Sequence, residues 1–165
     1  MIYLSALIFF LSSFTHKPAL APMRMTAVHF AVPSVLNKTL LLKLVNEARR
    51  TGVQCENVWH PPAPPLTWNV QLEAAALLHS ADMYQKKYFS HIEGDGSTAN
   101  TRIEKAGYNW MAYGENIGMG YTTEKDVIEA WLKSPGHCKN IMSPNYKEMG
   151  VGRVGDYWTQ DFASR

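Results

Sequence analysis

The 165-residue chain has only two cysteines, little net charge and no internal repeat. Sixteen lysines and arginines face fourteen aspartates and glutamates, so the formal charge is only +2, and the charged residues are scattered along the chain. Binding to nucleic acid needs a basic patch or stripe, so this composition excludes nucleic acid as a partner. With 46% hydrophobic and 18% charged residues, the chain is not disordered and its length fits one globular domain.

No apolar run in the sequence is long enough to span a membrane. The longest, residues 2–14, has thirteen uncharged residues and suits the apolar core of a signal peptide, with small residues for cleavage at 19–21. The alternatives are a true start at Met23 or Met25, or an uncleaved membrane anchor. The expected organisation is a signal peptide over 1–21, an N-terminal arm over 22–36 and one domain over 37–165.

The two cysteines, Cys55 and Cys138, have no CxxC spacing and no neighbouring thiol that would suit a zinc or redox site. One disulfide is their simplest use, and it agrees with export to an oxidising compartment. If the chain is not exported, two unpaired buried thiols are the better interpretation.

Apolar periodicity predicts helices in the first two thirds of the domain and strands at its end. The expected helices run from Asn37 to the stop at Gly52, over 69–87, over 101–106 and from Thr123 to Pro135-Gly136. Extended structure is expected over 113–121 and over 148–163 with a turn at Gly155-Asp156, and 53–65 is expected to be a loop. Helices before strands predict an α+β fold.

Seven short motifs follow one another in the domain: PLTWN at 65–69, FSH at 89–91, GENI at 114–117, AW at 130–131, SPGH at 134–137, NIM at 140–142 and MGVG at 149–152. Each is weak alone, but in this order they closely resemble the bacterial type of the CAP superfamily, or SCP domain. The resemblance covers about residues 40–162. It implies a secreted α-β-α sandwich, in which helices flank a small central antiparallel sheet.

The resemblance also implies a central cleft formed by His91, Glu115 and His137. All three are candidate ligand-binding residues, with His91 and His137 as metal ligands and Glu115 as a possible third. Eukaryotic members have a second glutamate shortly after the helix tryptophan. Here Leu-Lys-Ser follows Trp131, so that acid is missing, and whether Glu129 contributes to the cleft is left open.

Two imidazoles and one carboxylate can bind zinc or another divalent ion, or can act as a base, an orienting acid and a proton donor. The sequence has no HExxH spacing and places no serine, threonine or cysteine as an activated nucleophile, so no catalytic residue is assigned. Each candidate also has a structural alternative. His91 could be a solvated loop residue, and Glu115 and His137 could satisfy backbone groups.

Other conspicuous side chains are expected to be structural. His79 is expected in or near the core, Trp68 and Trp131 as core anchors, and Asn116 and Asn140 as partners of backbone groups. A disulfide at Cys138 would hold the segment that carries His137.

The preferred hypothesis is a monomeric, secreted binding module that acts outside the cell or in the cell envelope. Its cleft would bind a divalent metal, such as zinc, or a small or lipidic ligand. The alternative is a metal-assisted hydrolase or protease that uses the same cleft. A third hypothesis is a cell-envelope interaction protein that binds through its proline-rich segment or aromatic surface.

Overall fold

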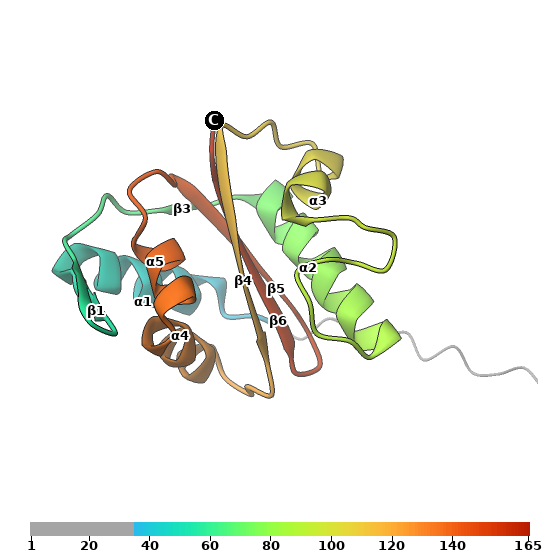
Figure 1. Ribbon diagram of the computed structural model, residues 1–165, viewed down its shortest axis with the longest axis horizontal. Coiled ribbons are helices and arrows are strands. Elements are labelled where there is room, and N and C mark those ends of the chain that lie inside the picture. Colours follow the sequence, from blue (N-terminus) through green and yellow to red (C-terminus); the bar gives the residue numbers. More distant parts are fainter. Residues whose placement is uncertain (1–34) are drawn as a thin grey trace, which may run out of the picture.

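The computed structural model describes residues 35–165, and the expected signal peptide and nearly all of the arm lie outside them (Figure 1). The helices are α1 (Lys38–Thr51), α2 (Val70–Lys86), α3 (Ala99–Lys105), α4 (Glu124–Lys133) and α5 (Pro135–Met142). The strands are β1 (Val53–Cys55), β2 (Val58–His60), β3 (Thr67–Trp68), β4 (Ala112–Met119), β5 (Glu148–Val154) and β6 (Tyr157–Ser164).

A four-stranded sheet with the order β3-β5-β6-β4 lies at the centre of the fold. The short β3 pairs parallel with β5, and the other two pairings are antiparallel. Helices α2 and α3 cover one face of the sheet, and α1, α4 and α5 lie on the other (Figure 1). The expected α+β sandwich is therefore confirmed.

The helices begin where the sequence offers side-chain caps. The Asn37 side chain accepts a hydrogen bond from the backbone of α1, and the Asn69 side chain accepts two from α2. Thr123 caps α4 in the same way, with Asp126 as its partner. Gly52 ends α1 with a positive φ of 76°, which favours a residue without a Cβ.

Two short elements were not expected. Residues 53–65, predicted to be a loop, contain the β1–β2 hairpin, whose two-residue turn is Glu56-Asn57. Pro135 was expected only to end a helix, but it also begins α5, because its fixed φ and missing N–H suit the first turn. His137 therefore lies on a helix, not on a loop.

Glycines bring α2 against the sheet. A Cβ at Gly150 would lie 2.1 Å from the backbone nitrogen of Glu73, and one at Gly152 would lie 2.2 Å from that of Leu77. Any other residue at either position would push the helix away. The MGVG motif thus sets the distance between α2 and β5.

The predicted disulfide between Cys55 and Cys138 is present. It joins β1 to the first turn of α5, and both cysteines are buried in the main apolar cluster. The bridge therefore fixes the helix that carries His137.

Candidate functional site

The three predicted cleft residues come from three separate elements. His91 lies in the loop between α2 and α3, Glu115 on β4 and His137 on α5. Strand β4 is an edge strand of the sheet, so the site lies at the sheet border, where a loop and a helix meet. No local sequence motif holds all three residues, which explains why spacing alone could not define the site.

Glu115 is the buried centre of this arrangement. Its Oε1 lies 2.6 Å from Nδ1 of His91, and Nη2 of Arg102 donates a hydrogen bond of 2.5 Å to its Oε2. Burial alone would raise the pKa of Glu115, but the hydrogen bond with His91 and the charge of Arg102 lower it below the ordinary value. The side chain is therefore an ionised, fixed carboxylate whose two oxygens are both engaged.

Arg102, on α3, is a site residue that the sequence analysis missed. Its guanidinium is buried and also donates to the backbone carbonyls of His91, at 3.2 Å, and Ser97, at 3.2 Å. It thus binds both the loop that carries His91 and the carboxylate that orients His91. In the sequence, Arg102 is only a charged residue next to Ile103 on a short helix. This pattern is too common to identify a site residue.

A second buried polar group supports the same loop. His79 on α2 is fully buried, as expected, with Nδ1 3.2 Å from Oε1 of Glu93 and Nε2 3.0 Å from the carbonyl oxygen of Ser90. Since a carbonyl oxygen can only accept, Nε2 carries a proton and donates to Ser90. Burial lowers the pKa of His79, although the nearby Glu115 and Glu93 charges oppose this shift.

The third cleft residue, His137, is half-buried at the start of α5. Burial, and then the charge of His91, lower its pKa below the ordinary value. Within residues 35–165, neither ring nitrogen of His137 nor Nε2 of His91 has a hydrogen-bond partner. Among the described residues, these three ring nitrogens are therefore left without a protein partner.

Two asparagines fix α5 to β4. The Asn140 amide donates to the carbonyl of Glu115 at 3.1 Å and to the side-chain oxygen of Asn116 at 2.9 Å, and Asn116 donates to the carbonyl of His137 at 3.2 Å. Both therefore satisfy backbone groups, as expected. Their combined effect is to hold His137 at a set position relative to Glu115.

A mainly apolar pocket of about 260 Å³ adjoins His137. It runs along the outer edge of β4, and Trp131 forms part of its wall and donates its indole N–H to the carbonyl of Ile117 at 2.9 Å. The residues that line it are Phe89, Ile117, Gly118, Met119, Tyr121, Ala130, Trp131, Ser134 and His137.

The missing second glutamate is not replaced by Glu129. That side chain is 49% exposed and lies 3.7 Å from Lys125 on the outer surface of α4. The second acid beside Glu115 is Asp161, its cross-strand partner on β6, which sequence reasoning missed. Asp161 is fully buried, and its carboxyl oxygens have no hydrogen-bond partner among the described residues. Burial and the Glu115 charge raise its pKa well above the ordinary value.

Comparison with known proteins now identifies the family. The family model of the cysteine-rich secretory proteins, CAP, matches residues 42–162. The chain belongs to the CAP family. The uncharacterized protein YkwD of Bacillus subtilis (strain 168) is 37% identical to this CAP chain over 103 residues. The alignment covers 61% of the chain and 40% of YkwD, so the chain spans well under half of that relative.

Two solved structures share the CAP fold. One is an extracellular SCP-domain protein from Bacillus anthracis str. Ames, with a TM-score of 0.68 and 28% identity, covering 77% of this chain and 40% of that one. The other is an outer surface protein of Borrelia burgdorferi, with a TM-score of 0.66 and 21% identity, covering 82% and 99%. At that identity, the second shows the fold alone.

The CAP cleft has an incomplete set of metal ligands. Within the described part of the chain, no group of three or more His, Cys, Asp or Glu side chains is placed to hold a metal ion. Because His91 and Arg102 engage both oxygens of Glu115, the arrangement offers the two imidazoles of His91 and His137 and leaves neither oxygen of the possible third ligand free. No helix in the same range is long and apolar enough to cross a membrane.

Proposed function

We propose that this CAP domain is a binding module that acts outside the cytoplasm and takes its ligand between His91 and His137. The observation that carries the proposal is the 2.6 Å contact between Glu115 and Nδ1 of His91. The carboxylate accepts the Nδ1 proton, so in the neutral form of the His91 ring the Nε2 lone pair is the one left for a ligand. A buried anion that fixes one tautomer of a half-exposed histidine prepares that histidine for a ligand.

The neighbouring pocket indicates the kind of ligand. Its volume of about 260 Å³ lies below the range of roughly 300–1,000 Å³ that is usual for drug-sized ligands. It can therefore hold a short apolar group, or one end of a longer lipidic molecule, but not a whole lipid. The imidazole of His137 at its border would meet a polar group of the same ligand.

Action outside the cytoplasm agrees with two further observations. The disulfide between Cys55 and Cys138 suits an oxidising compartment. The B. anthracis relative is described as an extracellular protein. Fractionation of the source cells, with detection of the intact disulfide by mass, tests this part of the proposal.

Binding of 1-anilinonaphthalene-8-sulfonate, an apolar ring system with one anionic group, tests the cleft. We expect binding that weakens at least tenfold in His137→Ala and stays unchanged in His60→Ala, a matched histidine on β2 outside the cleft. If both variants bind the probe as tightly as the parent protein, the pocket beside His137 is not the binding site.

A divalent ion between the two imidazoles is part of the same proposal. Zinc calorimetry tests it, with the His91→Ala and His137→Ala variants alone and combined. Micromolar binding that each single variant weakens would support a two-histidine site, with its remaining ligands supplied by water or by the bound molecule. The lack of zinc binding at neutral pH would remove the metal from the proposal and leave the apolar pocket intact.

Hydrolysis is the second candidate function, and the Glu115–His91 hydrogen bond favours it. A carboxylate that orients an imidazole is the usual arrangement for a histidine that acts as a general base. Ester and peptide substrate panels test it. Activity that falls in His91→Ala and in Glu115→Gln, with unchanged circular dichroism, would favour the enzyme over the binding module.

A further inference from the structure

Trp59 differs from the other four tryptophans of the chain. Each of those donates its indole N–H to a protein oxygen: Trp68 to Glu73, Trp110 to Glu104, Trp131 to the Ile117 carbonyl and Trp158 to the Tyr121 carbonyl. The indole N–H of Trp59 has no such partner within residues 35–165, and the residue is 56% exposed. A tryptophan that is neither buried nor hydrogen-bonded gives little to the stability of the fold and is available to a partner.

The indole is nevertheless held in place. A Cβ at Gly52 would lie 2.6 Å from Cζ2 of Trp59, so the six-membered ring packs directly against the backbone of this glycine. Trp59 lies on β2, whose partner strand β1 ends at Cys55 and is bridged to Cys138 on α5. Binding would therefore cost little side-chain ordering, because the ring is already positioned.

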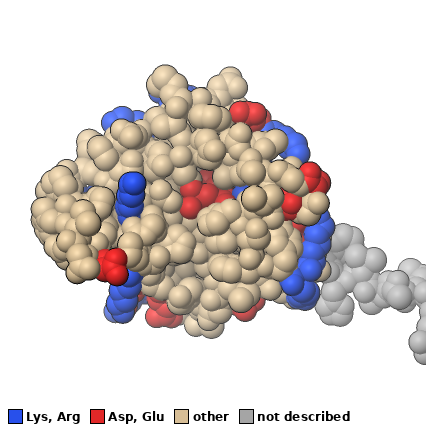
Figure 2. All heavy atoms as spheres, in the orientation of Figure 1, with Lys and Arg blue, Asp and Glu red and all other residues tan. Residues whose placement is uncertain are grey.

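The segment that carries Trp59 has no charged residue, and the charged side chains at the edge of the hairpin, Glu56 in its turn and Lys139 on α5, are of opposite sign. The twelve residues from Asn57 to Trp68 contain no Asp, Glu, Lys or Arg. Gln54 pairs with Trp59 across the hairpin, so its amide lies on the same face, whereas Val58, which is 59% exposed, pairs with Cys55 and points to the opposite face. The left end of the molecule in Figure 2, where Figure 1 places the hairpin, is mostly free of charged side chains.

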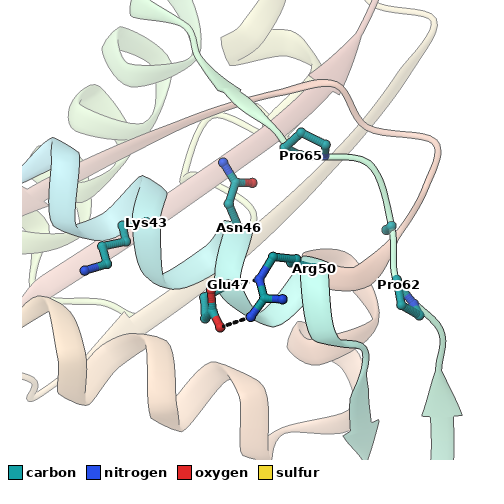
Figure 3. Close-up of a pocket in the computed structure, with 7 residues that line it drawn as sticks. Lys43, Asn46, Glu47, Arg50, Pro62 and Pro65 are labelled. Carbon is teal, nitrogen blue, oxygen red and sulfur yellow. Dashed lines mark hydrogen bonds and ion pairs between the residues drawn. The ribbon is translucent and has the colours of Figure 1, made fainter.

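Two hollows flank this surface. One, of about 510 Å³, lies between α1 and the proline-rich segment 62–65 (Figure 3). There Arg50 donates to Glu47 at 2.6 Å, so its charge is already paired, and Lys43 lies farther along α1. The other hollow, of about 410 Å³, lies between the hairpin and the start of α5 and is lined by Cys55, Glu56, Asn57, Val58, His60, Pro135, Gly136 and Lys139. An extended ligand could enter both hollows while it crosses the hairpin.

We propose that the face of the β1–β2 hairpin that carries Trp59 and Gln54, with Asn57 at its turn, binds an uncharged, unbranched glycan. The side chains on this face indicate the chemical class of the partner. With one acid and one base at its edge, this surface has no net charge of either sign, which favours an uncharged partner over a charged polymer. A rigid, exposed indole can stack on the apolar C–H face of a sugar ring, and its N–H, with the amides of Gln54 and Asn57, can bond to hydroxyl and acetamido groups. A lipid surface would use the indole but would leave these amides unpaired. This site is separate from the cleft at His91.

Calorimetry with chitohexaose and cellohexaose, two neutral β-linked hexasaccharides, tests the proposal on the full domain. We expect at least one to bind with a submillimolar Kd. Trp59→Ala should weaken binding at least tenfold, and Trp59→Phe, which keeps a ring but loses the N–H, should weaken it less. Leu78→Ala is the matched control, because Leu78 is a similarly exposed apolar residue on α2.

Three outcomes would overturn the proposal: no binding of either hexasaccharide at 5 mM, equal binding by Trp59→Ala, or equal loss in Leu78→Ala. Binding of phosphatidylcholine vesicles that depends on Trp59, without glycan binding, would replace the glycan by a membrane surface. The double variant His91→Ala/His137→Ala should bind the glycan normally, so failure of the cleft proposal would not affect this one. Unchanged far-ultraviolet circular dichroism and a cooperative thermal transition would show that the variants are folded.

Discussion

The two faces of the central sheet are built from different chemistry. Towards α1, α4 and α5, the sheet presents large apolar side chains such as Trp158 and Phe162, which pack into the main cluster around Trp131. Towards α2 and α3, the same strands alternate glycine with polar residues: Gly150 pairs with Asp161, and Gly152 with Thr159. One face is a conventional apolar core, and much of the other is a close-packed polar layer.

Because of this difference, we expect the two faces of the sheet to have different effects, one on the stability of the domain and the other on the geometry of the site. Apolar packing tolerates small adjustments, whereas a buried charge must keep its partner or be neutralised. On the α2 side, Glu115 and Arg102 form an ion pair of 2.5 Å, and the cleft histidine His91 is fixed to that pair and not to the apolar core. We therefore expect the apolar face to determine how stable the domain is, and the polar face to determine how its cleft is arranged.

Loss of the disulfide, whose two cysteines lie in the apolar cluster, should give the largest effect. The bridge closes a sequence separation of 83 residues, so the variant Cys55→Ser/Cys138→Ser should lose about 4–5 kcal/mol of unfolding free energy in the chain-entropy model. Urea unfolding of the oxidised parent and of the variant measures this loss. A loss below about 1 kcal/mol would show that packing alone holds α5 in place.

The second largest loss of stability should follow from removal of the buried cation, Arg102. Arg102→Met leaves Glu115 buried without its partner and should cost about 3–4 kcal/mol at pH 7. Because the folded-state pKa of Glu115 is lowered, the stability that the pair supplies is present at neutral pH and is lost as acid protonates the carboxylate. The difference between variant and parent should therefore shrink below about pH 4.

The matched control for that variant is Arg50→Met. Arg50 also pairs with a glutamate, Glu47, but both side chains are exposed, so its loss should change stability by less than about 0.5 kcal/mol. Equal losses in the two variants would contradict the assignment of Arg102 as the cation that supports the cleft. Loss of zinc or dye binding in Arg102→Met under conditions where it stays folded would confirm its positioning role.

Sequence patterns predicted the outer framework better than the polar layer. Caps and periodicity are local, so α1, α2, α4 and the final hairpin could be predicted from neighbouring residues. The charged pair of Arg102 and Glu115 joins two elements through the tertiary fold, and Asp161 reaches Glu115 only through the β4–β6 register. Helix α5 was missed because Pro135 both ends one helix and starts the next.

The variant Gly150→Ala, for which we expect a smaller loss of stability, tests whether glycine sets the distance between α2 and β5 on the polar face. Gly150→Ala places a Cβ 2.1 Å from the Glu73 backbone, which no side-chain rotation can relieve, and should cost about 2–3 kcal/mol. Gly94→Ala is the control, since a Cβ there meets nothing within 4 Å. Thermal unfolding should separate the two variants clearly. If they unfold at the same temperature, α2 can shift away from β5 without loss, and the polar layer is not close-packed.

The smallest expected effect is a gain in stability, from Asp161→Asn. Because the folded-state pKa of Asp161 is raised, the folded protein retains a proton that the unfolded chain releases, so stability falls as the pH rises above the unfolded value of about 4. Asparagine needs no proton and can donate its amide to Glu115. Relief of one unpaired buried carboxyl should add about 1–2 kcal/mol at pH 7 and nothing below pH 4.

Urea unfolding at pH 4, 5, 6 and 7 measures this gain, with Asp156→Asn in the exposed turn as the control for removal of an aspartate. If the unfolding free energy rises with pH in Asp161→Asn alone, relative to the parent protein, the acid beside Glu115 lowers the stability of the folded protein at neutral pH. A loss at pH 7 would mean that Asp161 is ionised and paired in the folded protein. In that case the two faces differ less than the geometry indicates, because the polar layer would itself be stabilising.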